Sequence, residues 1–110
     1  METNKIKAYL GFCIRSGGIV FGVDNIEQHR KRAYLIIVDK DLSENSMKTI
    51  EKSNERLNCP VLQTEGGLLE QLLCRPTVKA VLIRDKNLAA AILSAANGNP
   101  KFNLYSGGNN

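Results

Sequence analysis

The chain has 110 residues, of which 43% are hydrophobic and 24% charged, and its formal net charge is +4. This length predicts a single domain with one modest core, and the absence of an 18-residue apolar run predicts no transmembrane helix. The first five residues lack the basic-then-apolar layout of a signal peptide. We therefore expect a cytoplasmic protein without a membrane partner, whose mildly basic balance is compatible with RNA.

Cysteine and histidine usage argues against a metal centre. Cys13, Cys59 and Cys74 are odd in number and show no CxxC spacing, and His29 is the single histidine. These residues predict buried free thiols rather than a disulfide framework or a zinc site. No nucleophile–base–orienter set is visible, so we expect no enzyme, no cofactor and no metal.

Hydrophobic periodicity predicts five helices alternating with four short strands. Helical segments repeat apolar residues every three or four positions, and the strands are short apolar runs bounded by polar residues or glycine. In chain order we expect a helix over 5–15, a strand over 19–21, a helix over 24–31, a strand over 35–38, a helix over 44–57, a strand over 61–62, a helix over 68–73, a strand over 78–83 and a helix over 88–96.

Polar residues next to these segments predict where the elements begin. Asp24 or Asn25 is expected to cap the second helix, Ser43 the third, and Asp85 the last, since short oxygen-bearing side chains accept hydrogen bonds from unpaired helical N–H groups. Asp39, which follows a strand, is expected to be a loop residue rather than a magnesium ligand.

The alternation of helices and strands predicts an α/β fold, a three-layer α-β-α sandwich with a four-stranded mixed sheet and about five helices. We expect this domain to cover residues 1–98. The remaining residues, 99–110, are rich in Asn and Gly and are expected to fray, although Phe102, Leu104 and Tyr105 could dock on the domain or on a protein partner.

The segment from Gly17 to Asp41 reads as strand, glycine turn, helix and buried strand. Gly22 forms the turn, whose helix N-terminus could bind a phosphate or a base edge through unpaired N–H groups. Turn and cap chemistry alone would also explain Gly22, Asp24 and Asn25. The basic run Arg30-Lys31-Arg32 could track an RNA backbone, or could be a solvated helix end whose cations complement the helix dipole.

A family resemblance rests on an ordered set of segments. These are Arg15-Ser16-Gly17-Gly18-Ile19-Val20-Phe21-Gly22, Leu35-Ile36-Ile37-Val38-Asp39-Lys40-Asp41, Cys59-Pro60-Val61 and Val81-Leu82-Ile83-Arg84-Asp85-Lys86-Asn87-Leu88-Ala89. With them, residues 5–96 resemble the L-seven-Ae type superfamily of ribosomal proteins, the kink-turn RNA binders. The similarity is greatest to the small bacterial homologues encoded among translation genes. The resemblance implies an α-β-α sandwich and structured RNA as the partner.

The resemblance also implies which residues face RNA. The turn into the second helix, with Gly22, Asp24, Asn25 and Gln28, matches the segment that reads sheared G·A pairs, and the loop 73–77 matches a second RNA-facing loop. Arg75 in that loop could pair with a phosphate or stack on a base. We therefore predict an RNA-binding accessory factor of translation or ribosome assembly, whose RNA-binding residues are Gly22, Asp24, Asn25, Gln28, Arg30, Lys31, Arg32 and Arg75.

An alternative prediction follows from departures within the same turn. Asp24 and Asn25 stand where RNA-binding members of the family have asparagine and glutamate, and Gln28 stands where a lysine is expected. A carboxylate accepts hydrogen bonds but donates none, and it repels a phosphate backbone. The alternative is a protein–protein interaction module that keeps the fold but has lost kink-turn recognition, with the C-terminal tail as its contact.

Overall fold

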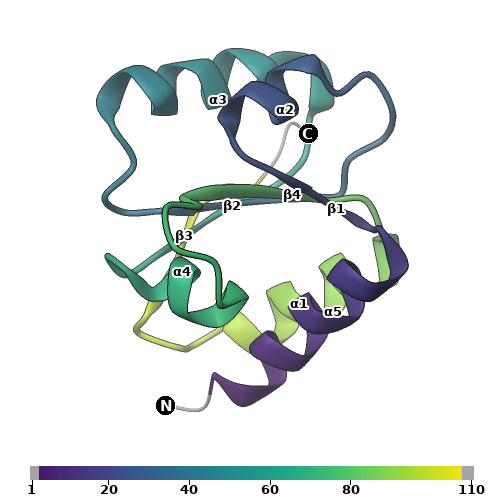
Figure 1. The fold of residues 1–110 in the computed structure, drawn as a ribbon, viewed down its shortest axis with the longest axis vertical. Coiled ribbons are helices and arrows are strands. Elements are labelled where there is room, and N and C mark those ends of the chain that lie inside the picture. The colour runs from purple at the N-terminus through teal and green to yellow at the C-terminus, as the bar shows by residue number, and fades with distance from the viewer. Residues whose placement is uncertain (1–2, 108–110) are drawn as a thin grey trace.

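The computed structural model describes residues 3–107 as a mixed α/β fold with five helices and a five-stranded mixed sheet (Figure 1). Within these residues, no helix combines the length and the apolar character needed to cross a bilayer. In chain order the elements are α1 (Asn4–Ser16), β1 (Ile19–Phe21), α2 (Val23–Gln28), β2 (Leu35–Asp39), α3 (Glu44–Leu57), β3 (Val61–Thr64), α4 (Leu68–Leu73), β4 (Ala80–Ile83), α5 (Lys86–Ala96) and β5 (Phe102–Ser106).

The sheet has the strand order β1-β4-β2-β3-β5. Strands β2 and β3 are parallel, and the other three pairings are antiparallel. Every residue of the neighbouring strands β2 and β4 is buried, as expected for continuous apolar strands that are covered on both faces. Because β1 and β2 both run antiparallel to β4, they point in the same direction, and their C-terminal ends lie at the same end of the sheet.

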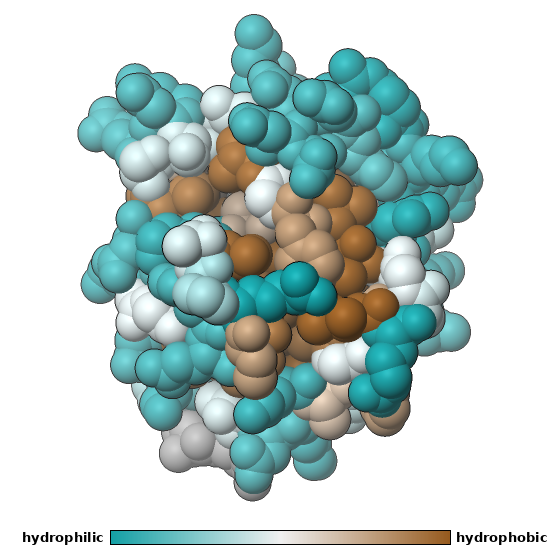
Figure 2. Space-filling view, in the orientation of Figure 1, coloured by the Kyte–Doolittle hydropathy of each residue, from teal (hydrophilic) through white to brown (hydrophobic). Residues whose placement is uncertain are grey.

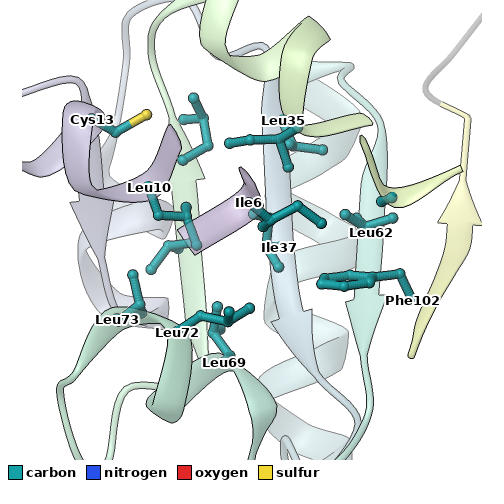
Figure 3. Packing of buried hydrophobic residues seen from close by; sticks show 14 of the residues in the cluster. Ile6, Leu10, Cys13, Leu35, Ile37, Leu62, Leu69, Leu72, Leu73 and Phe102 are labelled. Carbon is teal, nitrogen blue, oxygen red and sulfur yellow. The ribbon is translucent and has the colours of Figure 1, made fainter. Parts of the chain in front are cut away.

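Two apolar clusters lie on opposite faces of the sheet because alternate residues of β2 point to opposite sides. Leu35 and Ile37 pack in the larger cluster with side chains from α1 and α4 (Figure 3) and with side chains from α5. Ile36 and Val38 pack in the smaller cluster, with Ile26 of α2 and with α3. In Figure 1, α2 and α3 accordingly lie on one side of the sheet and α1, α4 and α5 on the other.

The predicted count of four strands is wrong, because part of the expected tail forms a fifth strand. β5 pairs with β3 in antiparallel register, with Phe102 opposite Thr64 and Leu104 opposite Leu62. Phe102 is buried in the larger cluster (Figure 3), so the expectation of a frayed terminus is wrong for 102–106. Residues 1–2 of the predicted domain and 108–110 of the predicted tail lie outside the described residues.

The second helix is shorter than predicted, ending at Gln28 instead of near Lys31. Cations satisfy the carbonyl groups at its C-terminal end. Arg56 donates to the Glu27 and His29 carbonyl oxygens at 3.1 and 2.9 Å, and Arg30 donates to the Glu27 oxygen at 2.8 Å. Arg30–Arg32 therefore belong to the loop before β2 rather than to a helix end.

The predicted caps of the longer helices are confirmed. Ser43 Oγ accepts a hydrogen bond from the Ser46 N–H at 3.1 Å, and Asp85 Oδ1 accepts one from the Leu88 N–H at 2.9 Å. These caps hold the start of α3 and of α5 at opposite ends of the sheet, since α3 follows β2 and α5 follows the antiparallel β4.

Candidate nucleic-acid interface

Gly22 makes the turn from β1 into α2 with backbone angles that favour glycine. Its φ is 89° and its ψ 152°, a region that is almost exclusive to glycine. Its N–H donates to the Ala80 carbonyl oxygen at 2.9 Å, and its own carbonyl oxygen accepts from the Ile26 N–H at 3.0 Å. A Cβ at this position would have no heavy atom within 4 Å. The backbone conformation, not lack of space, therefore makes glycine necessary here.

The polar residues of α2 do not cap the helix as predicted. Gly22 occupies the N-cap position, without a side-chain cap, and Asn25 Nδ2 instead donates backwards to the Phe21 carbonyl oxygen at 2.9 Å. Asp24, Asn25 and Gln28 are all exposed. Asp24, in the first turn, is placed where a carboxylate interacts favourably with the helix dipole. These side chains are accessible to a partner.

The loop after α4 is ordered by one carboxylate. Glu70 Oε2 accepts from the Thr77 N–H at 2.7 Å, and Glu70 Oε1 accepts from Lys79 Nζ at 2.8 Å. The hydrogen bond from Lys79, followed by that from Thr77, lowers the pKa of Glu70, and the same carboxylate raises the pKa of Lys79. Two residues of this loop adopt left-handed backbone, Cys74 with φ 55° and Thr77 with φ 73°.

The Gly22 turn and the loop after α4 lie side by side. The guanidinium carbon of Arg75 lies 4.4 Å from the centroid of the Phe21 ring, which is cation–π distance. Between the loops is a hollow of about 490 Å³. Figure 2, in the orientation of Figure 1, shows apolar surface between the two helical layers. The hollow is lined by Phe21, Gly22, Val23, Asp41, Leu42, Ser43, Ser46, Thr77, Val78, Lys79 and Ala80.

Asp39 is the buried last residue of β2, so the expectation that it is a loop residue is wrong, and it has a structural role close to this hollow. Its side chain is buried, and its two carboxylate oxygens accept from the Asp41 N–H at 2.8 Å and the Gly67 N–H at 2.9 Å. Asp39 thus ties the loop after β2 to the turn before α4. The residues described in the structure contain no group of three or more His, Cys, Asp or Glu side chains that could hold a metal ion.

The structure does not bring Arg30–Arg32 to the Gly22 turn. These residues precede β2, whose first residue, Leu35, pairs with Ile83, the last residue of β4. Gly22 instead bonds to Ala80, the first residue of β4. The basic run and the Gly22 turn are therefore at opposite ends of the sheet, and the eight predicted site residues divide into two sets.

The three cysteines differ in their exposure to solvent. Cys13 and Cys59 are buried, and burial raises the pKa of each thiol to about 11, with the carboxylate of Asp85 adding to the effect at Cys13. Cys74 is exposed at the end of α4, so the prediction of a buried thiol is wrong for Cys74.

Three further residues organise this surface without having been predicted for it, namely Phe21, Glu70 and Asp39.

A search against models of protein families finds no match, and no curated protein matches the chain. The description of the site therefore rests on its geometry: a glycine turn, an arginine over an aromatic ring, and an acceptor side chain at Asp24.

Proposed function

We propose that this chain binds structured RNA through the surface formed by the Gly22 turn and the loop 74–79, as an accessory factor of translation or ribosome assembly. The observation that carries the proposal is the contact of Arg75 with Phe21 beside Gly22. It joins two loops that the family resemblance associates with RNA. The finer description of the fold, a three-layer α-β-α sandwich, is part of the same proposal. It assigns the chain a cytoplasmic location and no catalytic role.

The chemistry of the surface suits an internal loop better than a regular helix. Arg75 presents a planar cation that can pair with phosphate or stack on an unpaired base. Asp24 accepts hydrogen bonds only, so it suits the amino and imino groups of exposed bases and disfavours phosphate. Gly22 has no side chain, and a Cβ there would have no heavy atom within 4 Å, which leaves space for a base to approach the backbone.

Fluorescence anisotropy with two RNA stems tests the proposal. One stem contains an internal loop with tandem sheared G·A pairs, and the other is fully paired and of equal length. We expect the wild-type chain to bind the first stem more tightly than the second. In Arg75→Ala this preference should fall by about 5- to 150-fold, which corresponds to the loss of about 1–3 kcal/mol from one stacking contact. Lys52→Ala, an exposed residue on α3, removes one charge at a distant position and should preserve the preference. Equal binding of both stems by the wild-type chain would reject the proposal.

The second candidate function, a protein–protein interaction module, is favoured by the exposed side chains of β5. Leu104 is 56% exposed and Tyr105 43% exposed on a strand at the edge of the sheet. Edge strands with apolar side chains are sites where another chain can pair. Sedimentation of the wild type and of Leu104→Ser separates the two functions. A monomer that is unchanged by the substitution, together with selective RNA binding, would argue against the module.

A further inference from the structure

The end of the sheet opposite the Gly22 turn carries seven exposed cations, which we call the basic rim. They come from the end of α1, the loop before β2, the end of α3, the residue after β4 and the start of α5. The basic rim comprises Arg15, Arg30, Lys31, Arg32, Arg56, Arg84 and Lys86.

Backbone pairing places these segments together. The Arg84 N–H donates to the Gly18 carbonyl oxygen at 2.7 Å, which joins the end of β4 to the end of α1. The Tyr34 N–H donates to the Ile83 carbonyl oxygen at 2.9 Å, which joins the loop 29–34 to the same end of β4. In Figure 1 the connection from α2 to β2 lies at the right, as does the C-terminal end of α1. The cations therefore flank the sheet on both of its faces.

The positive charge of the rim is only partly compensated by carboxylates within residues 3–107. The two salt bridges there, Lys48–Glu44 and Lys79–Glu70, lie elsewhere. Carboxylates at this end are Glu27, Glu55 and Asp85, and Asp85 is engaged as the cap of α5. Seven cations against three carboxylates leave +4, which equals the formal charge of the whole chain. The remaining charges balance one another, so the net charge of the protein is a property of this end.

The cations of the rim have two different roles. Arg30 and Arg56 bond to carbonyl oxygens at the end of α2, and Arg15 lies 4.8 Å from the centroid of the Phe12 ring. The side chains of Lys31, Arg32 and Lys86 make no hydrogen bond or ion pair within the described part of the chain, and the Arg84 side chain makes only a 3.4 Å contact with the Gly17 carbonyl oxygen. These four side chains are available to a ligand.

We infer that the basic rim is a second RNA-binding site, which holds the phosphate backbone of a duplex segment independently of base sequence. A spread of unpaired cations suits a polyanion of extended, regular charge. The inference rests on the proposed function only in choosing RNA as that polyanion. A protein with both sites would contact RNA at two opposite ends of its sheet.

The test measures binding of a blunt, fully paired 20-base-pair RNA duplex between 50 and 200 mM salt. With four cations on phosphates and a duplex coefficient of about 0.9 per contact, wild-type affinity should fall about 150-fold over this range. Lys31→Gln/Arg32→Gln/Arg84→Gln leaves one of the four, so its affinity should fall only about 3- to 4-fold. Its affinity at 50 mM salt should also be at least about 10-fold below that of the wild type.

The matched control is Lys5→Gln/Lys7→Gln/Lys40→Gln, which lowers the net charge equally at exposed positions away from the rim. We expect the control to keep wild-type affinity within about 2-fold and the same salt dependence. Thermal unfolding of both variants establishes that each is folded. Equal losses in the two variants, no duplex binding at all, or binding to vesicles of anionic lipid in place of the duplex would each overturn the inference.

The same variants separate this inference from the proposed function. If the rim variant loses duplex binding while the wild type shows no preference for the internal-loop stem, the rim stands and the proposed function fails. If Arg75→Ala abolishes that preference while the rim variant still binds duplex as tightly as the wild type, the proposed function stands and the rim inference fails.

Discussion

Replacing Gly22 by alanine tests whether the turn depends on backbone geometry, as its angles indicate. At φ 89° and ψ 152°, a residue with a Cβ incurs a conformational cost of about 2 kcal/mol, within a range of about 1–3. Alanine also lowers the conformational entropy of the unfolded chain, which stabilises the folded state by about 0.7 kcal/mol. The net loss is therefore about 1.3 kcal/mol. With an unfolding entropy of about 0.23 kcal/mol/K for this length, the midpoint of thermal unfolding should fall by about 6 °C.

Gly11→Ala is the matched control because it makes the same chemical change at a helical position. Gly11 lies inside α1, and a Cβ there would meet only the flexible end of Arg15 at 3.6 Å. We expect this variant to gain about 0.5–1 kcal/mol, or about 2–4 °C. Differential scanning calorimetry at neutral pH should thus separate the two variants by about 8–10 °C. A midpoint for Gly22→Ala at or above the wild-type value would refute the argument from backbone geometry.

Two further predictions concern titrating groups. The pKa of Glu70 is lowered in the folded chain, so its contribution to stability is present above the ordinary value of 4.5 and disappears as the pH falls through the folded value. Glu70→Gln should therefore be less stable than wild type at pH 7, and urea unfolding should show the gap closing as the pH falls below 4.5. A gap independent of pH would contradict the Lys79 pairing. Among the cysteines, Cys74 alone should react with a thiol reagent in the native chain at pH 8, because Cys13 and Cys59 are buried with pKa values of about 11. Mass spectrometry after brief labelling measures this reactivity, and modification of either buried thiol would contradict the prediction.

The order of elements was predictable because each one except β5 has a strong local signal. Continuous apolar runs identified β2 and β4, and Ser43 and Asp85 identified the start of two helices. The strand β5 has weaker signals: alternation of Phe102 and Leu104 with polar residues, inside a segment rich in Asn and Gly. Its strand structure depends on pairing with β3, a contact between residues about forty positions apart, and local patterns do not encode such a contact.

The end of α2 shows the same limitation at the candidate site. The sequence continues in a polar, basic segment to Arg32 without a helix-breaking residue, and it therefore predicts helix as far as Lys31. In the structure, Arg56 of α3 donates to the carbonyl oxygens of Glu27 and His29, which lie 29 and 27 positions earlier in the chain. That tertiary contact satisfies the groups that further helix would have paired. Prediction of the Gly22 turn succeeded because the backbone angles at that position require glycine. The loop that follows α2 depends instead on a tertiary contact with α3, which the local sequence does not encode.

The direction of the strands explains why two segments close in sequence lie at opposite ends of the molecule. Gly22 leaves β1 and Arg32 leads into β2, and because these strands run in the same direction, α2 must return along the sheet between them. The four residues of β4 separate the two ends by about 13 Å, at about 3.3 Å per residue. An RNA stem is A-form and rises less per base pair than B-DNA does (about 3.4 Å), so about five base pairs cover that distance. A stem of about five or more pairs beside an internal loop is therefore long enough to reach the basic rim while the loop contacts Arg75, so a single RNA can satisfy both proposed sites.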